Sequence, residues 1–242
     1  MQLIFEELDY QDTPLGPISL RRRSEPRLDN LLIYEVKLGE EFLMSSLFVE
    51  AEEQLSTLGL AALKQQGHQQ ELEVVVGGLG LGYTSLSALN DPAVKQVRTI
   101  DIMRPVISWH EQGLIPIGDV LAKDSRSELI HDDFFAVAQN QDSNGFIDDR
   151  SVHAVLLDID HSPNHWLNQG NESFYSLSSL EILASKIQAG GVFGIWSNEQ
   201  VDQKFTGLLE SVFNKVETHT IEFANPYSGK SSINSIYIAI NK

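Results

Sequence analysis

The first 49 residues alternate apolar and polar positions in short segments. Residues that favour β-strands fill three of them, QLIFEEL at 2–8, PISLRRR at 17–23 and LLIYEVKL at 31–38. Turn-forming residues separate these segments at 12–14 and 28–30. Such a pattern is typical of short strands joined by turns. We therefore expect a small antiparallel β-sheet at the N-terminus.

The remaining chain begins with a helical pattern and then alternates strand-like and helix-like segments. Leucine and alanine recur at helical spacing over 48–66, which predicts an amphipathic helix. The strands expected after it lie at 72–78, 96–102, 127–131, 153–160 and 191–196, and the helices at 83–89, 106–111 and 172–188. Near-continuous apolar strands that alternate with helices predict a parallel sheet covered on both faces.

The C-terminal segment departs from this alternation. A helix is expected after Gln200 and as far as Phe213, followed by strands at 215–223 and 235–240 with a turn at 225–229. Two strands joined by a turn add an antiparallel hairpin to the edge of a parallel sheet. The pattern therefore divides the chain into a small β-domain at 1–49 and a larger α/β-domain at 50–242, with one polar loop expected at 139–149.

The charge and composition narrow the classes of partner. Lys and Arg number 17 and Asp and Glu 34, so the formal net charge is −17. A chain of this charge repels phosphate backbones and anionic lipid headgroups, which disfavours nucleic-acid and membrane partners and favours a cationic substrate. The absence of cysteine excludes disulfides and thiolate catalysis. Neither a signal peptide nor a transmembrane run is recognisable, so we expect a cytoplasmic protein.

Glycines follow the predicted strand at 72–78 and precede the predicted helix at 83–89. Gly78, Gly80 and Gly82 at this turn let the backbone approach a ligand closely, although a glycine turn without a ligand is an open alternative. Asp101 ends the next strand, 19 residues after Gly82. An acid at that spacing is placed to accept hydrogen bonds from both ribose hydroxyls of a nucleoside.

Acids also follow the next two strands. Asp133 comes after the strand at 127–131, and Asp158 lies within the segment at 153–160. Ligand sites in open α/β sheets gather where strands end, so these side chains are candidates for the same site. Asp132 and Asp133 could instead cap a helix. The glycine spacing does not match the dinucleotide pattern G-x-G-x-x-G, which favours S-adenosylmethionine over a nicotinamide dinucleotide.

The motifs resemble those of class I S-adenosylmethionine-dependent transferases, and most closely those of spermidine synthases, the polyamine aminopropyltransferases. The glycine turn is similar to the GGGDGG loop of that family. Three further similarities lie in TIDIMRPVI at 99–107, HDDFF at 131–135 and VHAVLLDIDHSP at 152–163, the last resembling the strand that ends in the active-site motif DSSDP. The resemblance is clearest between 74 and 196.

This resemblance implies a Rossmann-like methyltransferase fold with seven mostly parallel strands, the last antiparallel, beside the small N-terminal sheet. It implies that Asp101 binds the ribose, Asp133 the adenine amine, and Gly78, Gly80 and Gly82 the cofactor. Decarboxylated S-adenosylmethionine as co-substrate, a polyamine acceptor and a homodimer are likewise implied. The expected activity is transfer of an aminopropyl group.

The chain departs from the family at the residues that handle the amine. Asp158 matches the first aspartate of DSSDP, but His161 stands where the second is expected, so Asp160 and His161 are both candidates for the base. Gly80 replaces the aspartate of the glycine loop. A methyltransferase that uses S-adenosylmethionine on an unknown acceptor and a non-catalytic nucleoside-binding protein are therefore alternatives.

Two further groups of residues, a histidine–aspartate cluster and the three tryptophans, suggest additional binding roles. His161 and His165 stand near Asp158 and Asp160, a set that could ligate a metal, but a loop over the cofactor pocket is the favoured interpretation and no metal is expected. Trp109, Trp166 and Trp196 could form an aromatic wall for a cation, or could fill the core.

Overall fold

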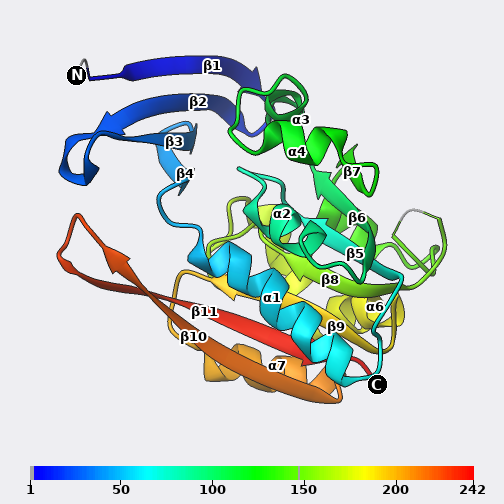
Figure 1. The fold of residues 1–242 in the computed structure, drawn as a ribbon. Helices are drawn as coiled ribbons and strands as arrows, with labels where there is room; N and C mark the ends of the chain where they lie inside the picture. Colours follow the sequence, from blue (N-terminus) through cyan, green and yellow to red (C-terminus); the bar gives the residue numbers. More distant parts are fainter. Residues whose placement is uncertain (1–2, 147) are drawn as a thin grey trace.

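The N-terminal sheet is the first of two sheets in this computed structural model, which describes residues 3–146 and 148–242 (Figure 1). Its four strands form an antiparallel meander. They are β1 (Phe5–Thr13), β2 (Gly16–Glu25), β3 (Leu31–Leu38) and β4 (Glu41–Ser45), with a short helix η1 (Pro26–Leu28) between β2 and β3. The predicted small sheet is confirmed, although Gln2, where its first strand was expected to begin, lies outside the described residues. The short strand β4 was not predicted.

The second sheet has seven strands in the order β10-β11-β9-β8-β5-β6-β7. Its strands are β5 (Leu72–Gly77), β6 (Val94–Asp101), β7 (Ser127–His131), β8 (Val152–Leu157), β9 (Ile187–Ser197), β10 (Lys215–Asn225) and β11 (Lys230–Ile240). The strands β5 to β9 pair in parallel, and β11 runs antiparallel between β9 and β10. The expected fold class, including the antiparallel last strand and the C-terminal hairpin, is confirmed.

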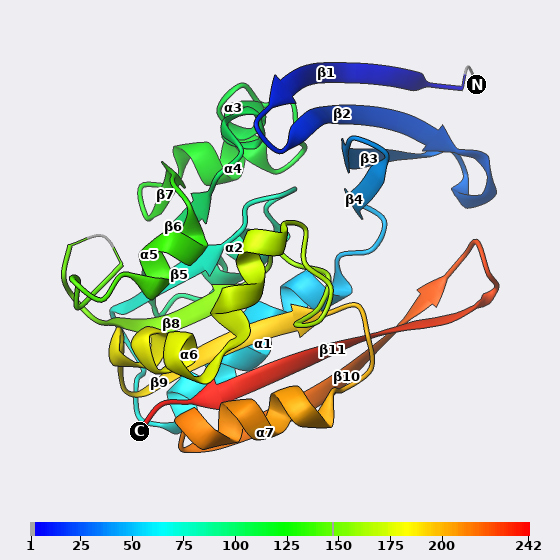
Figure 2. The same cartoon turned by 180° about the vertical axis from the view of Figure 1, so that it is seen from behind.

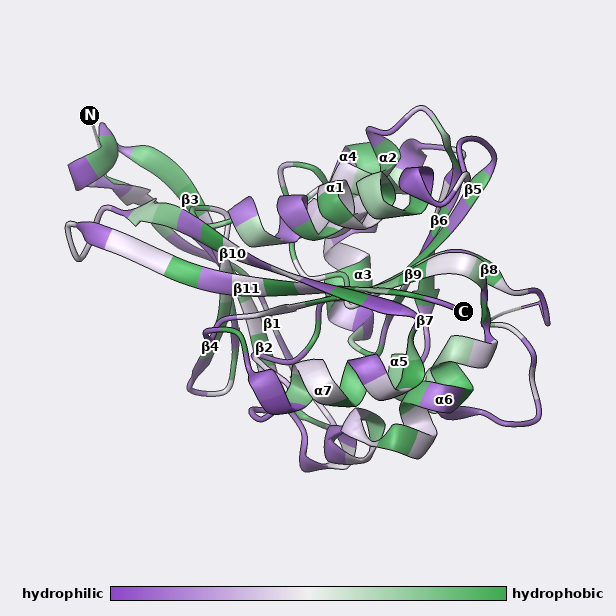
Figure 3. Cartoon of the chain, turned by 90° about the horizontal axis from the view of Figure 1, so that it is seen from below, coloured by the Kyte–Doolittle hydropathy of each residue, from purple (hydrophilic) through white to green (hydrophobic). Residues whose placement is uncertain are grey.

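Helices cover both faces of the central sheet (Figure 3). One face carries α1 (Glu50–Gln65), α2 (Tyr83–Leu89), α3 (Arg104–Glu111) and α4 (Gly118–Lys123). The other carries α5 (Phe134–Gln139), η2 (Gln169–Tyr175), α6 (Leu177–Ser185) and α7 (Gln203–Val212). In the part of the chain that the structure describes, no helix combines the length and apolar character required to cross a membrane.

The single helix predicted over 172–188 is wrong at both ends. The segment begins as the 3-10 helix η2, and α6 starts afresh at Leu177 because Ser176 adopts an extended conformation and its side chain accepts a hydrogen bond from the Ser179 N–H. The chain then enters β9 at Ile187. Hydrophobic periodicity does not detect such a cap when serine precedes an apolar run. The short helix α4 was also not predicted, and α5 was anticipated only by the alternative that Asp132 and Asp133 cap a helix.

The polar stretch at 139–149 leaves α5 and returns to the sheet as a loop, as expected for its described residues. Buried Lys186 fastens it, because the Nζ atom donates to the carbonyl oxygens of Asn140, Ser143 and Gly145. Ile147, inside this stretch, lies outside the described residues. The Lys186 ammonium group therefore anchors the first part of this loop.

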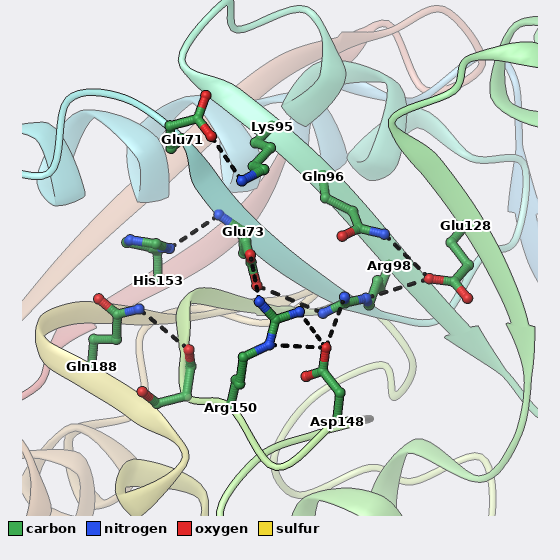
Figure 4. Close-up of polar contacts among 11 residues, drawn as sticks. Glu71, Glu73, Lys95, Gln96, Arg98, Glu128, Asp148, Arg150, His153 and Gln188 are labelled. Atoms are coloured by element: carbon green, nitrogen blue, oxygen red, sulfur yellow. Dashed lines mark hydrogen bonds and ion pairs between the residues drawn. The ribbon is translucent and has the colours of Figure 1, made fainter.

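Arg98 of β6 fastens the end of the same loop to the sheet (Figure 4). Its guanidinium lies 3.3 Å from Asp148 of the loop, 3.4 Å from Glu128 of β7 and 3.7 Å from Glu73 of β5. The Arg98 side chain is only 8% exposed, and Arg150 also pairs with Asp148 and Glu73. A buried arginine in the middle of a strand is tolerated here because acids from three segments neutralise it.

The N-terminal sheet lies across one end of the central sheet (Figure 2), and hydrogen bonds from β1 and β2 are among the contacts that join it to the rest of the chain. The Trp109 indole N–H donates to the Asp9 carboxylate of β1 over 2.6 Å. The Arg23 guanidinium of β2 donates to the Tyr227 hydroxyl at the tip of the β10–β11 hairpin over 2.8 Å. These contacts hold the small sheet over the strand ends where the predicted site lies.

Replacing Arg98 should destabilise the protein because it leaves the half-buried Glu73 with weaker neutralisation. We expect Arg98→Met to lower the free energy of unfolding by about 2–4 kcal/mol, measured by urea denaturation. The double variant Arg98→Met with Glu73→Gln should recover part of that loss. A single variant as stable as the parent chain would show that the network contributes little.

Candidate active site

A cavity of about 350 Å³ lies between the two sheets. One wall is apolar and comes from β2, β3 and β4 with the turn before them, namely Leu15, Ile18, Val36, Leu38, Leu43 and Met44. The opposite wall is formed by the carboxyl ends of β5, β6 and β8 and the segments that follow them. The N-terminal sheet therefore completes the site, and the polar groups come from the central sheet.

The glycine turn forms part of the polar wall. Gly78 and Gly80 line the cavity, while Gly82 lies behind it beside Leu121. Gly78 has a φ of +92°, and a Cβ atom there would lie 2.1 Å from the carbonyl oxygen of Asp158. Only glycine fits so close to the neighbouring strand end, so the turn can follow the floor of the cavity with its backbone exposed to a ligand.

His110 supports the turn from the side away from the cavity and was not predicted from the sequence. Its Nε2 lies 2.9 Å from the carbonyl oxygen of Gly80. Burial lowers the pKa of His110 to about 4, so the ring is neutral near pH 7 and its Nε2–H donates to that carbonyl. No sequence signal distinguishes this histidine from the apolar residues around it in α3.

Asp101 lies at the end of β6 and lines the cavity. One carboxylate oxygen accepts from the Leu79 N–H over 2.8 Å, and the other accepts from the Met103 N–H over 2.7 Å. Burial raises the pKa of Asp101, and these backbone donors oppose the rise. Each oxygen retains a further lone pair, so the carboxylate can hold the glycine turn and still accept from ligand hydroxyls.

Asp133 lines the cavity and also caps α5. Its Oδ1 accepts from the backbone N–H groups of Phe135 and Ala136 over 2.9 and 3.2 Å. Both bonds use Oδ1, so Oδ2 can accept from a ligand amine. The helix-cap interpretation is therefore confirmed for Asp133, and it is compatible with a place in the site. Its neighbour Asp132 is exposed at the same sheet edge.

Asp158 and Glu52 form a pair of carboxyl groups beside the cavity. Asp158, directly after β8, accepts from the Thr84 hydroxyl over 2.5 Å, and burial raises its pKa to about 6. Glu52 of α1 lines a smaller adjoining cavity with Asp158, and Met44 lies between the two cavities. Burial and the Asp158 charge raise the pKa of Glu52 to about 8. The pair therefore carries one proton and one negative charge near pH 7.

The structure separates the two candidates for the base. Asp160 is 3% exposed and is not part of the cavity wall. Its Oδ1 accepts from the Leu167 N–H and the Asn171 amide, and its Oδ2 from the Tyr175 hydroxyl, each over 2.8 Å. His161 lines the cavity, and its Nε2 lies 2.9 Å from the Glu41 carboxylate. Asp160 thus fastens the segment after β8, whereas His161 faces the ligand space.

The three tryptophans do not form a shared wall. Trp109 is fully buried, Trp166 donates to the Pro163 carbonyl, and Trp196 alone of the three lines the cavity. The Trp196 indole Nε1 is buried without a hydrogen-bond partner among the described residues. Residues 3–146 and 148–242 also contain no group of three or more side chains arranged to hold a metal ion.

Several solved structures share the fold of this chain at low sequence identity. A spermidine synthase in complex with the transition state analogue AdoDATO aligns with a TM-score of 0.70 and 14% identity, over 98% of this chain and 72% of its own. Spermidine synthase from Thermotoga maritima gives 0.69 and 13%, over 98% and 73%. No protein-family model and no curated protein sequence matches the chain.

A methyltransferase shares the fold over less of the chain. Human methyltransferase-like protein 13 in complex with SAH aligns with a TM-score of 0.60 and 17% identity, over 79% of this chain and 82% of its own. The chain therefore has the fold common to spermidine synthases and class I methyltransferases, as the sequence motifs led us to expect.

The carboxyl pair predicts an unusual dependence of stability on pH. Because the pKa of Glu52 is raised from 4.5 in the unfolded chain to about 8, the folded state binds more protons between these values, and stability falls as pH rises through them. We expect Glu52→Gln to be more stable than the parent chain at pH 8 by on the order of 1 kcal/mol, and nearly equal to it at pH 4.5.

Urea denaturation at the two pH values measures this difference. Glu53→Gln is the matched control, since Glu53 is the exposed neighbour on the same helix. Equal pH slopes for the Glu52 variant and the parent chain would show that the pKa of Glu52 is not raised in the folded state.

Proposed function

We propose that this chain is a transferase that binds the adenosyl group of a sulfonium co-substrate in the cavity between its two sheets. The observation that carries the proposal is the meeting of the glycine turn, Asp101 and Asp133 on one cavity wall, in the fold of a spermidine synthase that binds AdoDATO. Asp101 would accept from the ribose hydroxyls and Asp133 from the adenine amine. Gly78 lines the cavity, so its backbone is placed to contact the nucleoside.

The favoured reaction is aminopropyl transfer from decarboxylated S-adenosylmethionine to a polyamine. The acceptor amine attacks the carbon beside the sulfonium sulfur, the carbon–sulfur bond breaks, and methylthioadenosine leaves with the bonding electrons. The amine must lose a proton to act as a nucleophile, and we assign that proton to His161. The net negative charge of the Glu52 and Asp158 pair favours cationic groups near the reacting centre.

The alignment with spermidine synthases extends over more of this chain than the alignment with the methyltransferase, which favours aminopropyl over methyl transfer. The spermidine synthases align over 98% of this chain, and the methyltransferase over 79%. A methyltransferase that uses intact S-adenosylmethionine is the second candidate. Gly80 favours it, because the Met44 thioether packs on the glycine where the aminopropyltransferase family has an aspartate. Product analysis separates the two: methylthioadenosine marks aminopropyl transfer, and adenosylhomocysteine marks methyl transfer.

Removing the Asp101 carboxylate should weaken nucleoside binding. We expect Asp101→Ala to lose about 1–3 kcal/mol of binding free energy by calorimetry, because charge-assisted hydrogen bonds to the ribose are lost. The same carboxylate holds Leu79 and Met103, so thermal unfolding without nucleoside reports any damage to the turn. Asp132→Ala, at the same sheet edge, is the control. Unchanged affinity in Asp101→Ala would remove the ribose assignment.

Asp158→Asn should abolish turnover and leave the affinity for the uncharged nucleoside methylthioadenosine nearly unchanged. The substitution keeps the size of the side chain but removes the charge that faces the reacting centre. Steady-state assays of methylthioadenosine release measure turnover, and calorimetry measures binding. Preserved turnover would exclude Asp158 from the chemistry.

A further inference from the structure

Glu41 connects the N-terminal sheet to the residue assigned as the base. It is the first residue of β4, and its Oε1 lies 2.9 Å from Nε2 of His161, which follows β8 in the central sheet. The two residues are 120 positions apart in the sequence. The His161 side chain is 13% exposed and that of Glu41 41%, so the pair lies at the rim of the cavity. No pattern in the sequence relates them.

The contact fixes which ring nitrogen of His161 carries hydrogen. An ionised carboxylate can only accept a hydrogen bond, so the proton of the neutral ring must reside on Nε2. Nδ1 then has a free lone pair and is the atom that can take a proton from a substrate. When Nδ1 becomes protonated, the ring is a cation bonded to a carboxylate, which stabilises the product of proton transfer.

The other acids near His161 cannot replace Glu41. The oxygens of Asp160 already accept from three donors, so Asp160 acts on the ring only through its charge. Asp158 bonds to Thr84. The His165 ring lies 5.1 Å from that of His161, between centroids, and offers no negative charge. In the turn before β4, the exposed Glu40 lies 4.0 Å from the Lys37 ammonium group.

We propose that Glu41 is a positioning residue, which holds the His161 ring in the orientation and tautomer that leave Nδ1 free to accept the proton of the acceptor amine. This inference rests on the proposed transferase function. The small sheet then supplies part of the catalytic apparatus in addition to the apolar wall of the cavity.

The test compares Glu41→Gln and Glu41→Ala with the control Glu40→Ala. We expect Glu41→Ala to lower kcat about ten- to a hundredfold with KM little changed, because proton transfer and not binding is impaired. In Glu41→Gln the loss of kcat should be smaller than in Glu41→Ala, because the amide oxygen can still accept from the Nε2–H group although it has no charge to stabilise the protonated ring. A purely structural role would leave the tautomer of the His161 ring unchanged in both variants.

Nitrogen-15 NMR of the labelled histidines measures the ring directly and does not depend on turnover. The parent chain should show His161, identified with His161→Gln, as the Nε2–H form, and Glu41→Ala should show a mixture of both tautomers. Mixed tautomers in the parent chain, or unchanged kcat in both Glu41 variants, would overturn the proposal. If the parent chain turns over no polyamine, the aminopropyltransferase assignment fails, and the NMR result still decides whether Glu41 sets the tautomer of His161.

Discussion

The Asp101 carboxylate is the group on which the candidate site depends most. It accepts from the backbone N–H groups of Leu79 and Met103, and so joins the glycine turn after β5 to the segment after β6. The turn can adopt this path only because Gly78 passes against the carbonyl oxygen of Asp158 at the end of β8. Three neighbouring strand ends are thus fixed relative to one another, and together they form one wall of the cavity.

The carboxyl groups of Asp101, Asp133 and Asp158 face the cavity from the central sheet, opposite the apolar wall of the N-terminal sheet. Glu52 and Asp158 share a proton, His110 remains neutral beneath the glycine turn, and His161 is paired across the rim with Glu41. A cation with an apolar body suits such a space, which agrees with a sulfonium nucleoside and an amine acceptor. The N-terminal sheet contributes to the site in two ways. It provides Met44 of the apolar wall, and it provides Glu41, which bonds to His161.

Much of this arrangement is predictable because it is local in the sequence. Strands and the helix α1 follow from hydrophobic spacing, and Asp101, Asp133 and Asp158 follow strands whose carboxyl ends share one edge. Glu52 and Glu41 escape prediction because their partners lie more than 100 positions away. Sequence alone also leaves Asp160 and His161 equivalent as bases. Only the fold shows that Asp160 is occupied by three donors while His161 faces the cavity.

The most direct test of the account is calorimetric binding of decarboxylated S-adenosylmethionine in comparison with the intact compound, which carries one additional carboxylate. The negative charge of the Glu52 and Asp158 pair predicts that both bind and that the decarboxylated form binds more tightly. Tighter binding of the intact form would contradict aminopropyl transfer and favour a methyltransferase. Failure of both to bind would contradict the assignment of the cavity as a nucleoside site.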